Sequence, residues 1–159
     1  MRARTRLLAV DYGTVRVGLA VSDAERRIAS PLTTYERRGR DGDERYFRKL
    51  AEEEEVGRIV VGLPVHADGS EGQKAAEARK FGAFLVGVTG VPVTYFDERF
   101  TTVEAEGFLL AAGLTNKRRK ARRDRVAAQI LLQSYLEAGC PEESAPGPLQ
   151  GPAEEKAAP

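Results

Sequence analysis

The feature that most constrains the fold is a short apolar segment that ends in an acidic residue. Residues 5–12 read TRLLAVDY, and Gly13 follows at once. A strand that is apolar on both faces is typical of the centre of a sheet that is covered on both sides. Asp11 at the end of such a strand is costly to bury unless it is hydrogen-bonded, paired or bound to a metal. From this segment alone, Asp11 is either a metal-binding carboxylate or a residue that caps the following turn.

The hydrophobic periodicity of the rest of the chain predicts a β-β-β-α-β-α-β-α-α order. We expect further strands at 15–22, 28–36, 58–63 and 91–97, and helices at 41–55, 70–87, 102–112 and 124–138. This order predicts an α/β fold with a mixed five-stranded sheet, in which three antiparallel strands come first and alternating β and α units follow, flanked by helices. Pro31 favours an edge position or a bulge for the third strand.

Three of the expected helices begin with the spacing of a capping box, in which a short polar residue is followed three positions later by Glu or Gln. The pairs are Asp41 with Glu44, Ser70 with Gln73, and Thr101 with Glu104. In each pair the first side chain is expected to accept a hydrogen bond from the opening turn of the helix.

The length and composition of the chain favour one globular domain. We expect a folded domain over residues 1–139 and a flexible tail over 140–159, which is rich in Pro, Gly, Ala and Glu. No apolar run is long enough to span a bilayer, and the basic N-terminus leads into a strand rather than a signal-peptide core. We therefore expect a cytoplasmic protein without membrane contact.

The chain has few cysteine and histidine residues, which restricts the kinds of metal site that it can form. Cys140 is the only cysteine and His66 the only histidine. An intrachain disulfide, a Cys-rich zinc site and a site with several histidines are therefore excluded. Carboxylates remain, and these suit Mg²⁺ or Mn²⁺.

Glu98 is a second candidate ligand because it follows directly after the strand expected at 91–97. Functional groups of α/β sheets gather at the carboxyl ends of the strands. The alternative interpretation is a surface salt bridge with Arg99. Asp97 is expected to support the turn or Arg99 rather than a metal.

Asp124 is a third candidate, and it is expected to open the last helix. It shares a helical face with Ala127 and Ala128, whose small side chains would let the helix approach the sheet closely. The alternative is a helix N-terminal charge favoured by the macrodipole. If the fold brings Asp11, Glu98 and Asp124 together, they offer the hard oxygen ligands that two-metal phosphodiester hydrolysis requires.

A concentrated positive charge points to a nucleic-acid partner although the whole chain is nearly neutral. Residues 116–125 read NKRRKARRDR, with seven Lys or Arg and one Asp. We expect Lys117, Arg118, Arg119 and Lys120 to bind phosphates, with a solvated charged loop as the alternative. Three other residues are weaker candidates for nucleic-acid contacts: Arg16 after the Asp11 turn, Ser70 at a helix start, and Arg99 beside Glu98.

Four blocks of the sequence resemble one known family. They are LAVDYGTVRVGLAVSD, IVVGLPVHADGSEGQKAAEARKFGAFL, VPVTYFDERFTTVEAEGFL and DRVAAQILLQSYLE, which keep their order and spacing over residues 6–138. The chain is similar in these blocks to the YqgF/RuvX family, whose members are described as candidate Holliday-junction resolvases and as pre-16S rRNA nucleases. The resemblance implies an RNase H-like fold. It also implies that the acids of the D-x-G, DER and D-x-x-A-A motifs bind metal, and these fall on Asp11, Glu98 and Asp124.

The function expected from the residues and the resemblance is metal-dependent endonuclease cleavage of structured nucleic acid, at the 5′ end of pre-16S rRNA. The partners would be structured RNA or a four-way DNA junction, and the protein a monomer or a homodimer. The alternatives are a Holliday junction resolvase, which needs two related active sites, and a non-catalytic RNA-binding factor of ribosome assembly. D-Y-G-T also resembles the first phosphate loop of actin-like ATPases, but those proteins need a second such domain, for which 159 residues leave no room.

Overall fold

The computed structural model describes residues 4–111 and 120–142, with the backbone alone for residues 103, 108–109 and 120–124. The elements follow the expected order, with one short 3₁₀ turn, η1, added after the last strand. The strands are β1 (Arg6–Asp11), β2 (Arg16–Ser22), β3 (Ala29–Glu36), β4 (Val56–Leu63) and β5 (Val93–Asp97). The helices are α1 (Arg40–Glu53), α2 (Gln73–Thr89), η1 (Glu98–Phe100), α3 (Val103–Ala111) and α4 (Lys120–Glu137).

The strands form one mixed sheet in the order β3-β2-β1-β4-β5, which confirms the predicted fold class. β2 is antiparallel to both β1 and β3, whereas β4 is parallel to β1 and β5 is parallel to β4. β1 is therefore central, as its apolar sequence predicts. Pro31 lies on the edge strand β3 next to a shift in the register with β2, so both parts of the prediction for this proline are confirmed.

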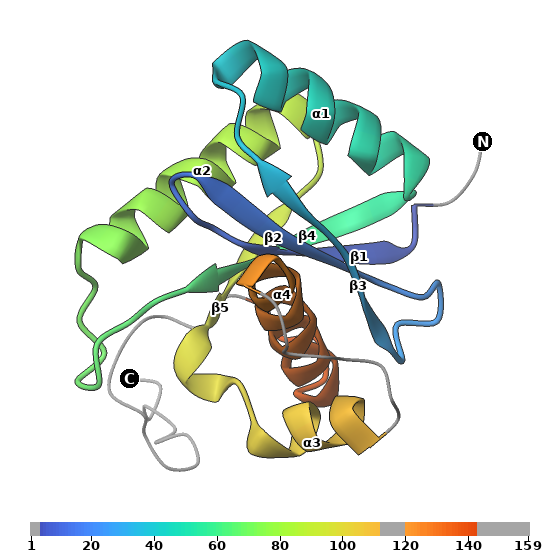
Figure 1. The fold of residues 1–159 in the computed structure, drawn as a ribbon, viewed down its shortest axis with the longest axis vertical. Coiled ribbons are helices and arrows are strands. Elements are labelled where there is room, and N and C mark those ends of the chain that lie inside the picture. The colour runs from blue at the N-terminus through green and yellow to red at the C-terminus, as the bar shows by residue number, and fades with distance from the viewer. Residues whose placement is uncertain (1–3, 112–119, 143–159) are drawn as a thin grey trace, which may run out of the picture.

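Helices cover both faces of the sheet (Figure 1), with α1 and α2 on one face and α4 on the other. The side chains of β1 alternate between the two layers. Leu8 and Val10 belong to the core under α1 and α2, and Leu7 and Ala9 belong to the core under α4. The same alternation assigns Asp11 to the face that α4 covers.

None of the three predicted capping boxes forms as predicted, and α1 and α2 begin without any side-chain cap. Gly39 precedes α1 and Gly72 precedes α2, and neither helix start has a side-chain cap. Ser70 lies outside α2 because its amide and hydroxyl both donate to Asp68 Oδ1, at 2.9 and 2.6 Å, which stabilises a loop instead. Asp41 falls inside the first turn of α1, where a negative charge is favourable.

The cap of α3 lies one residue later than predicted. The Thr101 hydroxyl donates to the Glu98 carbonyl at 2.8 Å and so closes η1. The Thr102 hydroxyl accepts a hydrogen bond from the Ala105 amide at 2.9 Å, which makes Thr102 the residue that caps the helix.

The last helix begins at Lys120, so the prediction that Asp124 opens it is wrong. The residues before Asp124 are Lys, Ala, Arg and Arg, which favour helix and extend it by a turn. Ala128, on the face predicted for Asp124, is fully buried against the sheet, whereas Ala127 is exposed. One of the two alanines therefore mediates the close packing that the sequence suggested.

Packing continues a short way past the expected end of the domain. The Tyr135 hydroxyl donates to the Pro141 carbonyl at 2.8 Å, and the Cys140 amide donates to the Tyr135 carbonyl at 3.1 Å. Cys140 also contacts the core under α4. Residues 143–159 of the expected tail lie outside the described part of the chain. Among the described helices, none is long and apolar enough to cross a membrane.

Candidate metal-binding active site

The candidate site lies where three parallel strands end side by side. Asp11 is the last residue of β1, and Glu98 follows Asp97, the last residue of β5. β4 lies between these two strands, and its Gly62 pairs with Phe96 of β5. Because the carboxyl ends of parallel strands meet at one edge of a sheet, two acids far apart in sequence are brought to the same place.

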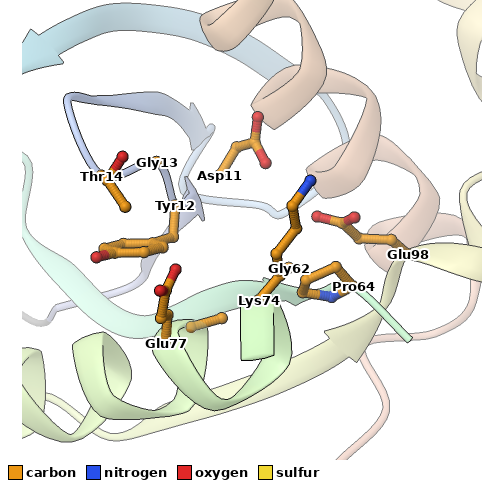
Figure 2. A pocket seen from close by; sticks show the side chains of 10 residues that line it. Asp11, Tyr12, Gly13, Thr14, Gly62, Pro64, Lys74, Glu77 and Glu98 are labelled. Carbon is orange, nitrogen blue, oxygen red and sulfur yellow. The ribbon is translucent and has the colours of Figure 1, made fainter. Parts of the chain in front are cut away.

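A pocket of about 380 Å³ opens at this edge, and both Asp11 and Glu98 line it (Figure 2). Its other walls come from the β1–β2 turn, the end of β4 and the first turns of α2. These residues are Tyr12, Gly13, Thr14, Gly62, Pro64, Lys74, Glu77 and Ala78. Two of the three predicted acids therefore lie in one cavity.

Gly62 makes room for Glu98 and for α4. A Cβ atom at this position would lie 2.8 Å from Glu98 Oε1 and 3.1 Å from Leu131 Cδ2, closer than side chains normally pack. Leu131 lies seven residues after Asp124 and hence on the same helical face. The face of α4 that carries Asp124 thus packs through Leu131 beside Gly62, a residue that lines the pocket. The Asp124 side chain itself lies outside what the structure describes.

The pocket places the half-buried acid Glu98 close to the positive charge of Lys74. Burial and, to a lesser degree, the neighbouring charge of Asp97 raise the pKa of Glu98 above its ordinary value. Lys74 acts in the opposite direction on this pKa, and Figure 2 shows its side chain extending from α2 between the carboxyl groups of Asp11 and Glu98. A positive charge at this place stabilises the charged form of a carboxylate that burial disfavours.

Arg99 is held by Asp97, as the sequence predicted for that pair. Its guanidinium donates to both carboxylate oxygens of Asp97, with the Nε–Oδ2 distance at 2.9 Å, and Nη1 donates to the Ala67 carbonyl at 3.2 Å. The Asp97 carboxylate also accepts the Arg99 amide at 2.8 Å. This ion pair holds η1 and thereby the position of Glu98. Arg99 therefore acts by positioning Glu98 beside the pocket.

The remaining predicted contacts with nucleic acid lie away from this pocket or outside the described residues. Arg16 is exposed at the start of β2 and does not line the pocket. Ser70 is engaged with Asp68 in the loop before α2. Lys117, Arg118 and Arg119 lie outside the described residues, and only the backbone of Lys120 is described, as the first residue of α4.

The pocket also contains three residues that the sequence pattern does not predict there, Tyr12, Lys74 and Glu77. Lys74 and Glu77 lie in α2, which is separated from β4 by a loop. Only the packing of α2 across the end of the sheet brings them to the acids. Their signal in the sequence is weak, because a Lys and a Glu near a helix start are ordinary surface residues. Tyr12 directly follows Asp11 and was treated as part of the apolar strand.

The oxygen ligands of the pocket fit a hard divalent cation. Asp11 enters it from the end of β1 and Glu98 from η1, directly after β5, and Gly62 leaves space beside Glu98. Among the side chains that the structure describes, no group of three His, Cys, Asp or Glu lies close enough to hold a metal.

Comparison with known structures places the sheet in the RNase H-like class. The chain matches Thermus thermophilus RuvC in complex with Holliday junction substrate at a TM-score of 0.58 and 15% identity, covering 87% of this chain and 98% of that one. It matches the fowlpox virus Holliday junction resolvase at a TM-score of 0.51 and 14% identity, covering 84% and 99%. Likeness at these identities establishes the fold, which is RNase H-like.

The sequence comparisons identify the family. Residues 5–138 match the family described as RuvX, Holliday junction resolvase, and the chain belongs to it. A relative from Rhodopirellula baltica is 48% identical over 136 residues, which cover 86% of this chain and 79% of the relative. One from Anaeromyxobacter dehalogenans is 43% identical over 136 residues, covering 86% and 99%. Both relatives carry the name "Putative pre-16S rRNA nuclease".

The close contact at Gly62 gives a first testable prediction. A methyl group in Gly62→Ala would displace the side chains of Glu98 and Leu131, and a shift of about 1 Å in a group that takes part in a reaction can cost on the order of a hundredfold in rate. We expect nuclease activity to fall by about ten- to a hundredfold in steady-state assays. Gly87→Ala in α2 is the matched control, since nothing lies within 4 Å of its added Cβ. Full activity in Gly62→Ala would contradict the role assigned to this contact.

Proposed function

We propose that the chain is a metal-dependent endonuclease that hydrolyses phosphodiester bonds in structured RNA and processes the 5′ end of pre-16S rRNA in the cytoplasm. The observation that carries this proposal is the convergence of Asp11 and Glu98 in one pocket at the ends of β1 and β5. The names of the relatives direct the choice of substrate. Structured RNA is also the polyanion expected to bind the basic segment around Lys117–Lys120.

In this proposal Asp11, Glu98 and Asp124 hold Mg²⁺ or Mn²⁺. Such ions activate a water and stabilise the leaving oxygen of a phosphodiester. Burial disfavours the charged form of the Glu98 carboxylate, and a bound cation would stabilise that charged form. Asp97 and Arg99 keep Glu98 in place through their ion pair. Lys74 adds a positive charge beside the acids that suits a phosphate oxygen of the bound strand.

A second candidate, the resolution of four-way DNA junctions, is favoured by the description of the family that the chain matches. Phosphate contacts alone do not distinguish RNA from DNA. Junction cleavage requires two active sites of related geometry, so this function implies a homodimer, whereas the processing of an RNA end can proceed in a monomer.

Metal-dependent cleavage of parallel substrates tests the proposal. Purified protein is incubated with a precursor rRNA end, an unstructured RNA and a DNA four-way junction, in Mg²⁺, Mn²⁺ or EDTA. We expect the rRNA precursor to be cleaved at its 5′ side in either metal and not in EDTA. Preferred cleavage of the junction by a dimer would establish the second candidate. Binding of RNA without cleavage in any metal would overturn the nuclease proposal in favour of a non-catalytic assembly factor.

A further inference from the structure

A second pocket adjoins the acid pocket on the side of α1 and α2. It also measures about 380 Å³, and it shares Tyr12 and Glu77 with the first pocket. Tyr12 directly follows Asp11, and Figure 2 shows its ring on the side of the acid pocket away from Glu98. The two pockets therefore adjoin at Tyr12 and Glu77.

Three aromatic rings pack against one another in the second pocket. The Tyr12 and Phe81 rings lie 4.8 Å apart between centroids, and Phe81 and Phe84 lie 5.7 Å apart in a stacked arrangement. Phe81 is buried, whereas Phe84 is half-buried and lines the opening. An aromatic ring held in this way can stack a nucleobase without first losing freedom of its own.

Arg37 is fixed across these rings by a buried acid. Its Nε donates to Asp43 Oδ2 at 3.1 Å and its Nη1 donates to the Tyr12 hydroxyl at 2.9 Å. The guanidinium carbon lies 5.2 Å from the Phe81 centroid and 5.5 Å from the Tyr12 centroid. The wholly buried Asp43 side chain fixes Arg37 through this ion pair. Arg37 in turn holds Tyr12 in place through its hydrogen bond to the Tyr12 hydroxyl, and it also carries a positive charge.

Two more cations at the opening suit a phosphate. Arg40 and Lys80 line the pocket and are exposed, and neither forms an ion pair with another described residue. The Arg40 guanidinium lies 6.0 Å from the Phe84 ring centroid. An aromatic surface with cations beside it is the combination by which proteins bind single strands.

We propose that this second pocket, bounded by Tyr12, Arg37, Arg40, Lys80 and Phe84, binds one unpaired nucleotide of the nucleic-acid strand next to the bond that is cut. The base stacks on Phe84, and Arg40 and Lys80 contact its phosphates. The inference rests on the proposed function for the position of the cut. It goes further by specifying the substrate: the strand must be unstacked beside the scissile bond, because a paired base cannot reach an aromatic surface inside a pocket.

Binding in EDTA tests the phosphate contacts without any need for cleavage. The probe is a short fluorescein-labelled oligouridylate, titrated by anisotropy at several salt concentrations. In Arg40→Gln/Lys80→Gln we expect weaker binding and a salt dependence shallower by about 1.4 in slope, from two lost contacts with a single strand. Arg4→Gln/Arg27→Gln removes two exposed cations at the opposite end of β1 and β2 and serves as the matched control.

A second comparison isolates stacking on Phe84. Phe84→Leu retains an apolar side chain against the core and removes the ring face. The parent protein should bind oligouridylate about fivefold to a hundredfold more tightly than an abasic strand of equal length, the range expected for one stacked base. The variant should lose this preference while it binds the abasic strand as the parent does. Such coupling between the base and Phe84 is not produced by a general loss of stability.

The outcomes separate this inference from the proposed function. If both variants show the expected weaker binding of oligouridylate and the parent cleaves no substrate in Mg²⁺ or Mn²⁺, the nucleotide site is supported and the nuclease proposal is overturned. Metal-dependent cleavage by the parent with unchanged binding by both variants would overturn the nucleotide site and leave the nuclease. Parent protein that binds duplex RNA but no single strand would also overturn it.

Discussion

Asparagine in place of Asp11 is expected to lower phosphodiester cleavage by at least about a thousandfold, since a bound metal supplies several kcal/mol of transition-state stabilisation. Asparagine has the shape of aspartate but lacks the negative charge that a divalent cation requires. Asp11 lines the pocket from the central strand, so its replacement disturbs little packing. We expect the variant to fold normally and to lose the thermal stabilisation that millimolar Mg²⁺ gives the parent.

The matched control is Asp23→Asn, which makes the same chemical change at the far end of the β1–β2 pair. Asp23 Oδ1 accepts the Arg27 and Ile28 amides at 2.7 and 3.0 Å, and the amide oxygen of asparagine can accept both. This variant should cleave as fast as the parent. Substantial activity in Asp11→Asn, measured as initial rates on the same substrate, would remove Asp11 from the metal site.

Alanine in place of Asp43 is expected to destabilise the protein by about 3–4 kcal/mol, because breaking a buried ion pair leaves its partners uncompensated. The buried carboxylate accepts the Tyr35 hydroxyl at 2.7 Å, the Arg38 amide at 2.9 Å and Arg37 Nε at 3.1 Å. Urea denaturation measures the loss. Asp41→Ala, two residues earlier and exposed, should cost at most about 1 kcal/mol as a helix N-terminal charge.

The same cluster predicts how the stability changes with pH. Burial acts to raise the pKa of Asp43, but the hydrogen bonds from Arg38, Tyr35 and Arg37 outweigh it and lower the pKa below its ordinary value. Its contribution is therefore present above the ordinary pKa of aspartate and is lost as the pH falls through the folded-state pKa.

At alkaline pH the stability changes in the opposite direction and falls as the pH rises. Burial, with the Asp43 hydrogen bond second, raises the pKa of Tyr35 to about 12. This contribution is present below the ordinary pKa of tyrosine and is lost as the pH rises toward the folded-state value. Asp43→Ala should weaken both effects, so the free-energy difference from the parent should shrink at both extremes of pH. A difference that stays constant across the whole range would contradict the assigned contacts.

The sequence predicted the architecture because the apolar pattern of each strand carries the necessary information. The β1 segment is apolar on both faces, and β1 is central. Pro31 has no amide hydrogen, and it lies on an edge strand at a shift in register. Both features depend on the residues of one strand and not on its tertiary partners, so they can be inferred from the sequence.

Helix starts and the wall of the pocket could not be predicted in the same way. Ser70 has the spacing of a cap, but Asp68 competes successfully for its hydroxyl. Lys74 reaches the acids only through the packing of α2 across the sheet. Tyr35 and Asp43 meet because β3 and α1 fold against one another, and neither residue carries a local signal of that contact. Local patterns determine elements, whereas side-chain partners depend on the assembled tertiary structure.

The parallel pairing of β1, β4 and β5 also determines when Asp11 and Glu98 come together during folding. Asp11 emerges early in an antiparallel hairpin with β2, a local contact that forms fast. Glu98 reaches it only after β4 and β5 have docked in parallel, which are non-local pairings that close long loops. An incompletely folded chain therefore lacks an assembled pair of acids, and on the proposed function it would not cut nucleic acid before its sheet is complete.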